Sequence, residues 1–112
     1  MAYYLESESR ELRERFEGIV LGWEGVHKKM MFGSPSYVAG GTSFAMLVTG
    51  GIILTRLDEE MRKRLLEDPN AGYFEAHGRI IRKWVRIRIQ DPSDIERYLP
   101  WIMASYTAAR GE

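Results

Sequence analysis

The sequence predicts an α+β fold, a two-layer α/β sandwich in which an antiparallel sheet packs against helices. Apolar residues recur at helical spacing near both ends of the chain. Between them, short apolar runs are separated by glycine pairs, which are typical of hairpins because a type I′ turn needs positive φ at both central positions. The predicted element order is α-β-β-β-α-β-β-α, in a single domain over residues 1–112.

The first helix is predicted over residues 6–24. Its apolar stripe follows the helical period and comprises Leu5, Leu12, Phe16, Ile19, Val20 and Trp23. Glu6 and Glu8 suit the positive end of a helix. Gly22 and Gly25 mark its end.

Three strands are predicted next, as a β-meander. Residues 30–38 count as one broken strand, interrupted by Gly33-Ser34-Pro35. Gly40-Gly41 and Gly50-Gly51 are expected to be the two-residue loops of the hairpins that follow. Neither glycine pair matches a phosphate-binding loop, because neither precedes a helix.

The loop at Gly50-Gly51 determines which side chains share a face of the sheet. One face then carries three cross-strand pairs: Val48 with Ile53, Met46 with Thr55, and Phe44 with Leu57. The other face carries Ala45, Leu47, Ile52, Leu54 and Arg56. Both faces are largely apolar. One packs on the helices, and the second needs a cover, which could be a helix, a partner subunit or a ligand.

The second helix is predicted to begin at Asp58, whose side chain can cap it. It is anchored by apolar residues and ends near residues 68–72. Two strands follow, a short one over residues 73–76 and a longer one over residues 84–89. In the longer strand, Val85, Ile87 and Ile89 lie on one side and alternate with Trp84, Arg86 and Arg88 on the other.

The last helix is predicted to start at Asp91-Pro92, a cap followed by proline at the first helical position. Apolar residues then line one face of it: Ile95, Leu99, Ile102, Met103 and Tyr106. Pro100 lies inside this pattern, so it is expected to kink the helix or divide it in two.

Composition bounds the possible functions. Sixteen basic and sixteen acidic residues cancel, so no overall field steers the protein toward nucleic acid or a membrane. The chain has no cysteine, which excludes disulfides and thiolate chemistry and fits a reducing compartment. The N-terminus does not resemble a signal peptide, and no apolar run is long enough to span a bilayer. A cytoplasmic protein without membrane contact is expected.

Several short pieces resemble the N-terminal domain of the TfoX/Sxy proteins, known as regulators of competence. They lie between about residue 30 and residue 105, in the family's order and spacing. The matching pieces are Met31-Phe32-Gly33, Tyr37-Val38, Phe44-Ala45, Leu54-Thr55-Arg56-Leu57, Gly78-Arg79 and residues 99–101. Departures from the family pattern are His77, where an apolar residue is more common, and Pro100.

The resemblance implies a secretion-chaperone-like two-layer fold, a role without known enzymatic activity, and no cofactor. It supplies no catalytic residues. In longer TfoX proteins a helical C-terminal domain follows this one, whereas this sequence ends at Glu112, so the resemblance leaves open whether the competence role applies.

The most unusual stretch is the basic segment over residues 79–89. Its candidate binding residues are Arg79, Arg82, Lys83, Trp84, Arg86 and Arg88. Strand alternation places Arg82, Trp84, Arg86 and Arg88 on one face, which could hold phosphates and stack a base. The favoured interpretation is a solvated face whose arginines pair with acids from Glu59, Glu60 or the first helix. A dimer interface is the third possibility.

Glu75 and His77 are the other candidate pair. In an extended segment they would point the same way, placing a base beside an orienting acid. No nucleophile lies nearby in sequence, and His27 is the one other histidine, so a metal site lacks ligands. A surface histidine is the favoured interpretation.

The leading functional prediction is a non-enzymatic interaction or regulatory module, resembling the TfoX N-terminal domain, that forms a homodimer through the second apolar face. A nucleic-acid-associated domain using Arg82, Trp84, Arg86 and Arg88 is the first alternative. A small-molecule pocket near Glu75 and His77 is the second. No catalytic, metal or cofactor site is predicted.

Overall fold

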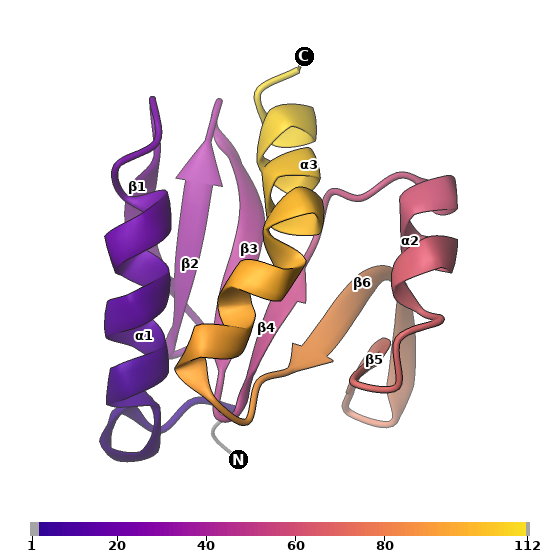
Figure 1. Ribbon diagram of the computed structural model, residues 1–112, viewed down its shortest axis with the longest axis horizontal. Helices are drawn as coiled ribbons and strands as arrows, with labels where there is room; N and C mark the ends of the chain where they lie inside the picture. Colours follow the sequence, from indigo (N-terminus) through magenta and orange to yellow (C-terminus); the bar gives the residue numbers. More distant parts are fainter. Residues whose placement is uncertain (1–2, 112) are drawn as a thin grey trace.

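Six strands in the described residues 3–111 form one antiparallel sheet, in the order β1-β2-β3-β4-β6-β5. In the computed structural model the elements are α1 (Glu6–Val20), β1 (His27–Met31), β2 (Ser34–Ala39), β3 (Thr42–Val48), β4 (Gly51–Leu54), α2 (Glu59–Leu65), β5 (Ala71–Ala76), β6 (Arg79–Arg88), the 3₁₀ helix η1 (Pro92–Tyr98) and α3 (Leu99–Ala109). Figure 1 shows α1, α3 and α2 on the same side of the sheet, in that order from left to right. The predicted α+β fold with an antiparallel sheet is confirmed.

The predicted helix signals act where the sequence places them. The Asp58 carboxylate accepts a hydrogen bond of 2.8 Å from the Met61 N–H at the start of α2. Asp91 caps η1 in the same way through the Ser93 N–H. Pro100 lies in the first turn of α3, so the last helical pattern is divided into η1 and α3 as expected.

The first helix is shorter than predicted. α1 ends at Val20, and Leu12, Phe16 and Val20 are its buried apolar residues. Leu5, predicted in the stripe, is 46% exposed because it is the N-cap residue and precedes the first helical turn. The buried apolar stripe therefore begins at Leu12, about two turns after Leu5.

The prediction that residues 30–38 form one broken strand is wrong, because they contribute to two strands. β1 and β2 are joined at Phe32-Gly33, where φ is 53° and 79°. The sequence has no glycine pair at this position, and phenylalanine is rare in the left-handed region. The sequence therefore does not predict a hairpin loop here. Gly40-Gly41, with φ of 62° and 80°, closes the β2–β3 hairpin as predicted.

The loop of the β3–β4 hairpin is Thr49-Gly50 and not Gly50-Gly51. Val48 pairs with Gly51, and Met46 pairs with Ile53, so the predicted pairs of Val48 with Ile53 and Met46 with Thr55 are wrong. The β4 partner of each β3 residue lies two positions earlier in the chain than predicted. Because side chains alternate with a period of two, the faces predicted for these residues survive the change.

Phe44 is the exception to the predicted faces. The β2–β3 register shifts between Tyr37, which pairs with Ala45, and Val38, which pairs with Ser43, so Phe44 is the extra residue of a β-bulge. The bulge turns Phe44 to the helical side. Leu57, its predicted partner, is also in the helical core, so the Phe44–Leu57 pair on the second face is wrong.

Two apolar clusters lie on opposite faces of the sheet. The larger one lies under the helices and includes Ala45, Leu47, Ile52 and Leu54, four of the residues predicted to share that face. The smaller one comprises Met46, Val48, Ile53 and Phe74, with Tyr3, Met31, Ala76, Ile81 and Trp84 packed against it. We call the side of the sheet that carries the smaller cluster the open face.

Candidate binding face

The open face contains a hollow of about 510 Å³, which we call the groove. Its floor is formed by Met46 and Val48 from β3 and by Ile53 from β4. Four aromatic side chains line it: Tyr3, Phe32, Phe74 and Trp84. Hollows of roughly 300–1,000 Å³ with mostly apolar walls are typical of ligand sites. The groove has that size and character.

Segments far apart in the chain build the walls of the groove. The ring of Phe74 lies 6.0 Å from that of Trp84 and 5.7 Å from that of Tyr3. Tyr3 is held there by the β3–β4 loop, because Thr49 N–H donates to the Tyr3 carbonyl at 2.9 Å. Leu5 N–H in turn donates to Thr49 Oγ1 at 2.8 Å. The N-terminal segment is therefore part of the groove, a role that no local sequence pattern predicts.

Two hairpin tips form opposite rims of the groove. Phe32 and His77 both line it, each with a left-handed φ (53° and 52°) and each followed by a glycine. Phe32 is 87% exposed. A left-handed conformation is costly for a residue with a large side chain, and such strain clusters at functional positions.

The predicted Glu75–His77 pair is not formed. β5 ends at Ala76, and His77 belongs to the turn, so the segment is not extended through His77. Glu75 pairs with Ile80 across the hairpin and does not line the groove. His77 instead lies 6.2 Å from the ring of Tyr3.

Two arginines of β6 lie beside the groove. Ile53 pairs with Met46 on one side and with Arg86 on the other. Gly51 likewise lies between Val48 and Arg88. A second hollow of about 250 Å³ is lined by Thr49, Gly50, Arg86 and Arg88. The apolar groove and the cationic hollow are therefore adjoining parts of one face.

The cations of β6 are not neutralised by the acids expected to do so. No ion pair is formed by Arg79, Arg82, Lys83, Arg86 or Arg88 with a carboxylate among residues 3–111. Glu59 pairs with Lys63 inside α2, at 3.8 Å. Glu60 pairs with Arg64 at 3.1 Å. The predicted pairing of these cations with Glu59, Glu60 or the first helix is wrong, whereas the solvated position predicted for them agrees with the structure, in which all five are exposed.

The predicted grouping of Arg82 with Trp84 is also interrupted. The β5–β6 register shifts between Tyr73, opposite Val85, and Phe74, opposite Ile81. Residues 82–84 lie opposite this break. Ile81 and Trp84 both join the open-face cluster, so simple alternation does not run through Arg82 and Lys83. Neither of these two cations lines the groove or the cationic hollow.

Carboxylates are absent from the strand residues of the open face. Within the described strands, Glu75 is the one acidic residue. It neighbours Phe74 and Ala76, both of which belong to the open-face cluster, so it lies on the other side of β5. The open face consequently presents cations without compensating acids, although the whole chain has zero formal net charge.

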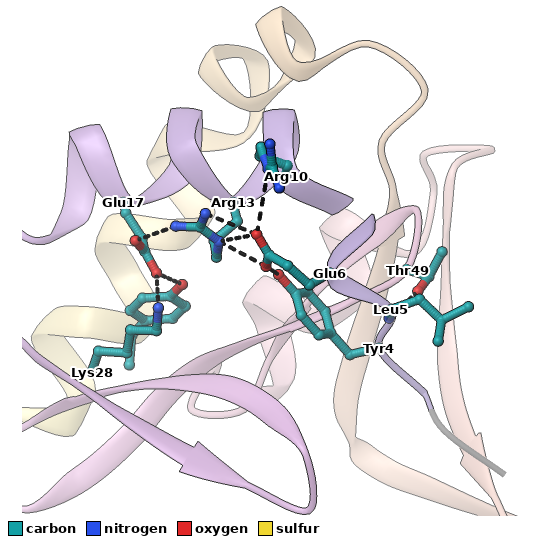
Figure 2. A network of polar contacts seen from close by, with 9 residues as sticks. Tyr4, Leu5, Glu6, Arg10, Arg13, Glu17, Lys28 and Thr49 are labelled. Atoms are coloured by element: carbon teal, nitrogen blue, oxygen red, sulfur yellow. Dashed lines mark hydrogen bonds and ion pairs between the residues drawn. The ribbon is translucent and has the colours of Figure 1, made fainter. Parts of the chain in front are cut away.

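A polar network lies on the helical side, and Figure 2 shows its members between α1 and the strands. Glu17 accepts hydrogen bonds from Arg13 (3.0 Å) and Tyr37 (2.7 Å), and its Oε2 lies 2.9 Å from Lys28 Nζ. Burial alone raises the pKa of Glu17, but the hydrogen bonds from Tyr37 and Lys28 outweigh it and hold the pKa below its usual value. Burial, with the hydrogen bond to Glu17, raises the pKa of Tyr37.

Glu6 continues this network at the start of α1. It accepts hydrogen bonds from Arg13, at 2.9 Å from Nε, and from the Tyr4 hydroxyl. These bonds, that from Arg13 first, lower the pKa of Glu6 to about 2. Burial and the bond to Glu6 raise the pKa of Tyr4 to about 12. Both shifts favour fixed charge states at neutral pH, so the network attaches α1 to the sheet and has no group suited to proton transfer there.

The other candidate sites in the described residues give weaker evidence for a binding function. A hollow of about 520 Å³ between the first turns of α1 and residues 89–92 is lined by charged, polar and aliphatic side chains and by no aromatic one. Among residues 3–111, no group of three or more potential ligands could hold a metal ion. None of the helices in this part of the chain combines the length and apolar character needed to cross a bilayer.

Comparisons with known proteins add no relative. No family model, curated protein or solved structure matches the chain. The resemblance to the TfoX N-terminal domain therefore stays a prediction that depends on the residues quoted for it.

Proposed function

We propose that this protein is a non-enzymatic cytoplasmic interaction module that binds its partner on the open face of the sheet. The observation that supports this most directly is the groove, an apolar hollow of about 510 Å³ that the helices leave uncovered. A resemblance to the TfoX N-terminal domain is in keeping with a regulatory module of this kind.

The side chains of the groove favour binding over a purely structural role. Phe32 exposes 87% of its surface at the rim while its backbone is held at a φ of 53°. A water-exposed aromatic ring in a strained turn contributes little to folding. It gains a role if a partner buries it, because burying an aromatic side chain contributes roughly 1.5–3 kcal/mol.

A neutral apolar probe tests the proposal without assuming anything about charge. We expect 1-octanol to shift the backbone amide resonances of Ile53, Phe74 and Ile81 in a saturable NMR titration. Met103 on α3, which is 43% exposed, serves as the internal control for nonspecific apolar contact. Ala76→Phe should weaken binding by filling the groove, since Ala76 lines it without being fully buried.

Two results would end this proposal. One is an absence of shifts on the open face at saturating octanol. The other is an equal response of Met103 and the groove residues, which would mean that any exposed apolar side chain attracts the probe. A spectrum of Ala76→Phe that is unchanged on the helical side shows that the variant is folded.

The alternative partner is a second copy of this chain, bound through the open face to form a homodimer. It is favoured by the uncovered apolar cluster and by Phe32 at the rim of the groove, which is 87% exposed. It is opposed by charge, because a two-fold contact would bring the cations of one open face toward those of its copy. Sedimentation velocity of a monomer at micromolar concentration, in both low and high salt, would exclude the dimer.

Nucleic-acid binding is the other alternative, since aromatic and arginine side chains share the open face. It requires a continuous track of cations along the backbone of the nucleic acid. Arg82 and Lys83 would have to belong to that track together with Arg86 and Arg88. Loss of oligonucleotide binding on changing either pair would support this alternative.

A further inference from the structure

We infer that the ligand of the open face is a small amphiphilic anion, with an apolar chain or ring in the groove and one carboxylate or phosphate head on Arg86 and Arg88. The inference rests on the proposed function and names the chemical class that the same face would bind. It follows from the position of the two hollows relative to each other.

The apolar and cationic parts of the site are one strand apart. Ile53 on the groove floor pairs directly with Arg86, and neighbouring strands lie about 4.8 Å apart. Gly51 pairs with Arg88 and has no side chain to separate Val48 from the arginines. A β-carbon at Gly51 would stand 3.5 Å from Val48 Cγ2 and 3.6 Å from Arg86 Cγ. A ligand can therefore contact the floor and the cations at once.

The two arginines suit a compact anionic head. Arg86 and Arg88 are two residues apart on one side of β6, about 7 Å along the strand. Neither is neutralised by a carboxylate among residues 3–111, and both line the hollow of about 250 Å³. Guanidinium groups bind carboxylate and phosphate in bidentate geometry.

The walls of the groove indicate that the part of the ligand away from its head group is uncharged. Aside from Ser34 and His77, the side chains that line the groove are aliphatic or carry an aromatic ring, and none carries a carboxylate or an ammonium group. A ligand with charges along its whole length would bury some of them against Met46 and Phe74 without partners, which is unfavourable. One charge at one end fits the separation of the two hollows. Arg82 and Lys83 line neither, so they take no part.

The test compares probes that share one chain and differ in head charge: octanoate, octyl phosphate, 1-octanol and octylammonium, each titrated by calorimetry at low ionic strength. We expect the two anions to bind about 3- to 30-fold more tightly than octanol, because one or two exposed ion pairs add roughly 0.7–2 kcal/mol. Octylammonium should bind less tightly than octanol. The advantage of the anions should shrink in 0.5 M NaCl.

Matched variants of β6 locate the head group. Arg86→Gln/Arg88→Gln should abolish the preference for octanoate over octanol while leaving octanol binding intact. Arg82→Gln/Lys83→Gln removes the same charge from the same strand and should leave the preference unchanged. If octanoate is preferred over octyl phosphate in the parent protein, the head is a carboxylate, and the reverse order identifies a phosphate.

The failure of this inference can be told apart from the failure of the proposed function. If octanol binds the groove and the anions bind no better, the anionic head is wrong while the open face remains a binding surface. An equal loss from both double variants, or tight binding of oligothymidylate in place of octanoate, would overturn the amphiphile in favour of nucleic acid. If no probe binds the open face, both proposals are wrong.

Discussion

Gly51 stands in β4 where a larger residue would meet the neighbouring strand. A β-carbon there would lie 2.7 Å from the Ile87 carbonyl oxygen, which belongs to the backbone and cannot rotate away. Gly51→Ala should lower the free energy of unfolding by about 1–3 kcal/mol, the usual range for overpacking. Gly72→Ala is the control, because no atom lies within 4 Å of the corresponding position in β5. Urea unfolding should find Gly72→Ala neutral or slightly stabilising, and equal losses in the two variants would contradict the steric argument.

At Phe32, by contrast with Gly51, the residue type does not suit the backbone conformation. Its φ of 53° is unfavourable for phenylalanine and better tolerated by asparagine. Phe32→Asn should therefore raise the free energy of unfolding by roughly 0.5–1 kcal/mol while weakening octanol binding in the groove. Phe32→Leu, which keeps the backbone cost, should leave stability near that of the parent protein. A destabilised Phe32→Asn variant would mean that the ring stabilises the free protein.

At the level of elements, α1 is attached to the sheet by a network that depends on pH. The folded-state pKa of Glu17 is lowered, and that of Glu6 is lowered to about 2. A lowered folded pKa means that the stabilisation is present above the unfolded pKa of about 4.5 and is lost as the pH falls toward the folded value. We expect the free energy of unfolding to decrease between about pH 5 and pH 2.

Glu17→Gln checks the source of that decrease. It should destabilise the protein by about 1–2 kcal/mol at pH 7, since charge-assisted hydrogen bonds are lost, and should flatten the decrease at low pH. Glu14→Gln lies on the same helix, exposed and outside the ion pairs of residues 3–111, and should retain the parent profile. Parallel acid profiles for Glu17→Gln and the parent would place the pH dependence elsewhere.

The elements that the sequence predicted are those with local chemistry. Asp58 and Asp91 cap helices, and Pro100 divides one, because each acts through its own neighbours in the chain. The predictions that were wrong depend on contacts across strands. The bulge at Phe44 depends on the pairing of β3 with β2, which no local pattern marks. The turn at Phe32-Gly33 coincides with the interruption predicted at Gly33-Ser34-Pro35, but with phenylalanine at one of its two positions it lacks the glycine pair that would indicate a hairpin.

The binding face was predictable in part for the same reason. Period-two alternation correctly placed Met46, Val48 and Ile53 on a second apolar face. Tyr3 and Phe74 join them only because the N-terminal segment and the β5–β6 hairpin approach β3 and β4 in space. The missing neutralisation of Arg86 could not be predicted from a chain whose charges sum to zero.

On the scale of the whole molecule, zero formal net charge conceals an uneven distribution of charge. Acidic residues lie almost entirely in the helices and loops, whereas the described strands hold one carboxylate, Glu75, against the cations of β1 and β6. Ion pairs within the helical layer, such as that of Arg10 with Glu6, are attractive. On the open face like charges are neighbours. The net charge of the chain therefore does not indicate the electrostatic field near the groove, which is the field that acts on a bound ligand.

This separation predicts opposite responses to salt at the two surfaces. Arg86 and Arg88, about 7 Å apart along β6, repel each other by about 0.6 kcal/mol in water, and 0.5 M NaCl screens most of that. Arg86→Gln should therefore gain less stability from salt than the parent protein in urea unfolding at 20 mM and 500 mM NaCl, by about 0.3 kcal/mol. Arg10→Gln removes an attraction, so its gain from salt should exceed that of the parent. Salt effects on apolar burial are common to all three proteins and cancel in the comparison. Equal salt responses would mean that the open-face cations are neutralised in solution, and the electrostatic basis for an anionic ligand would then be lost.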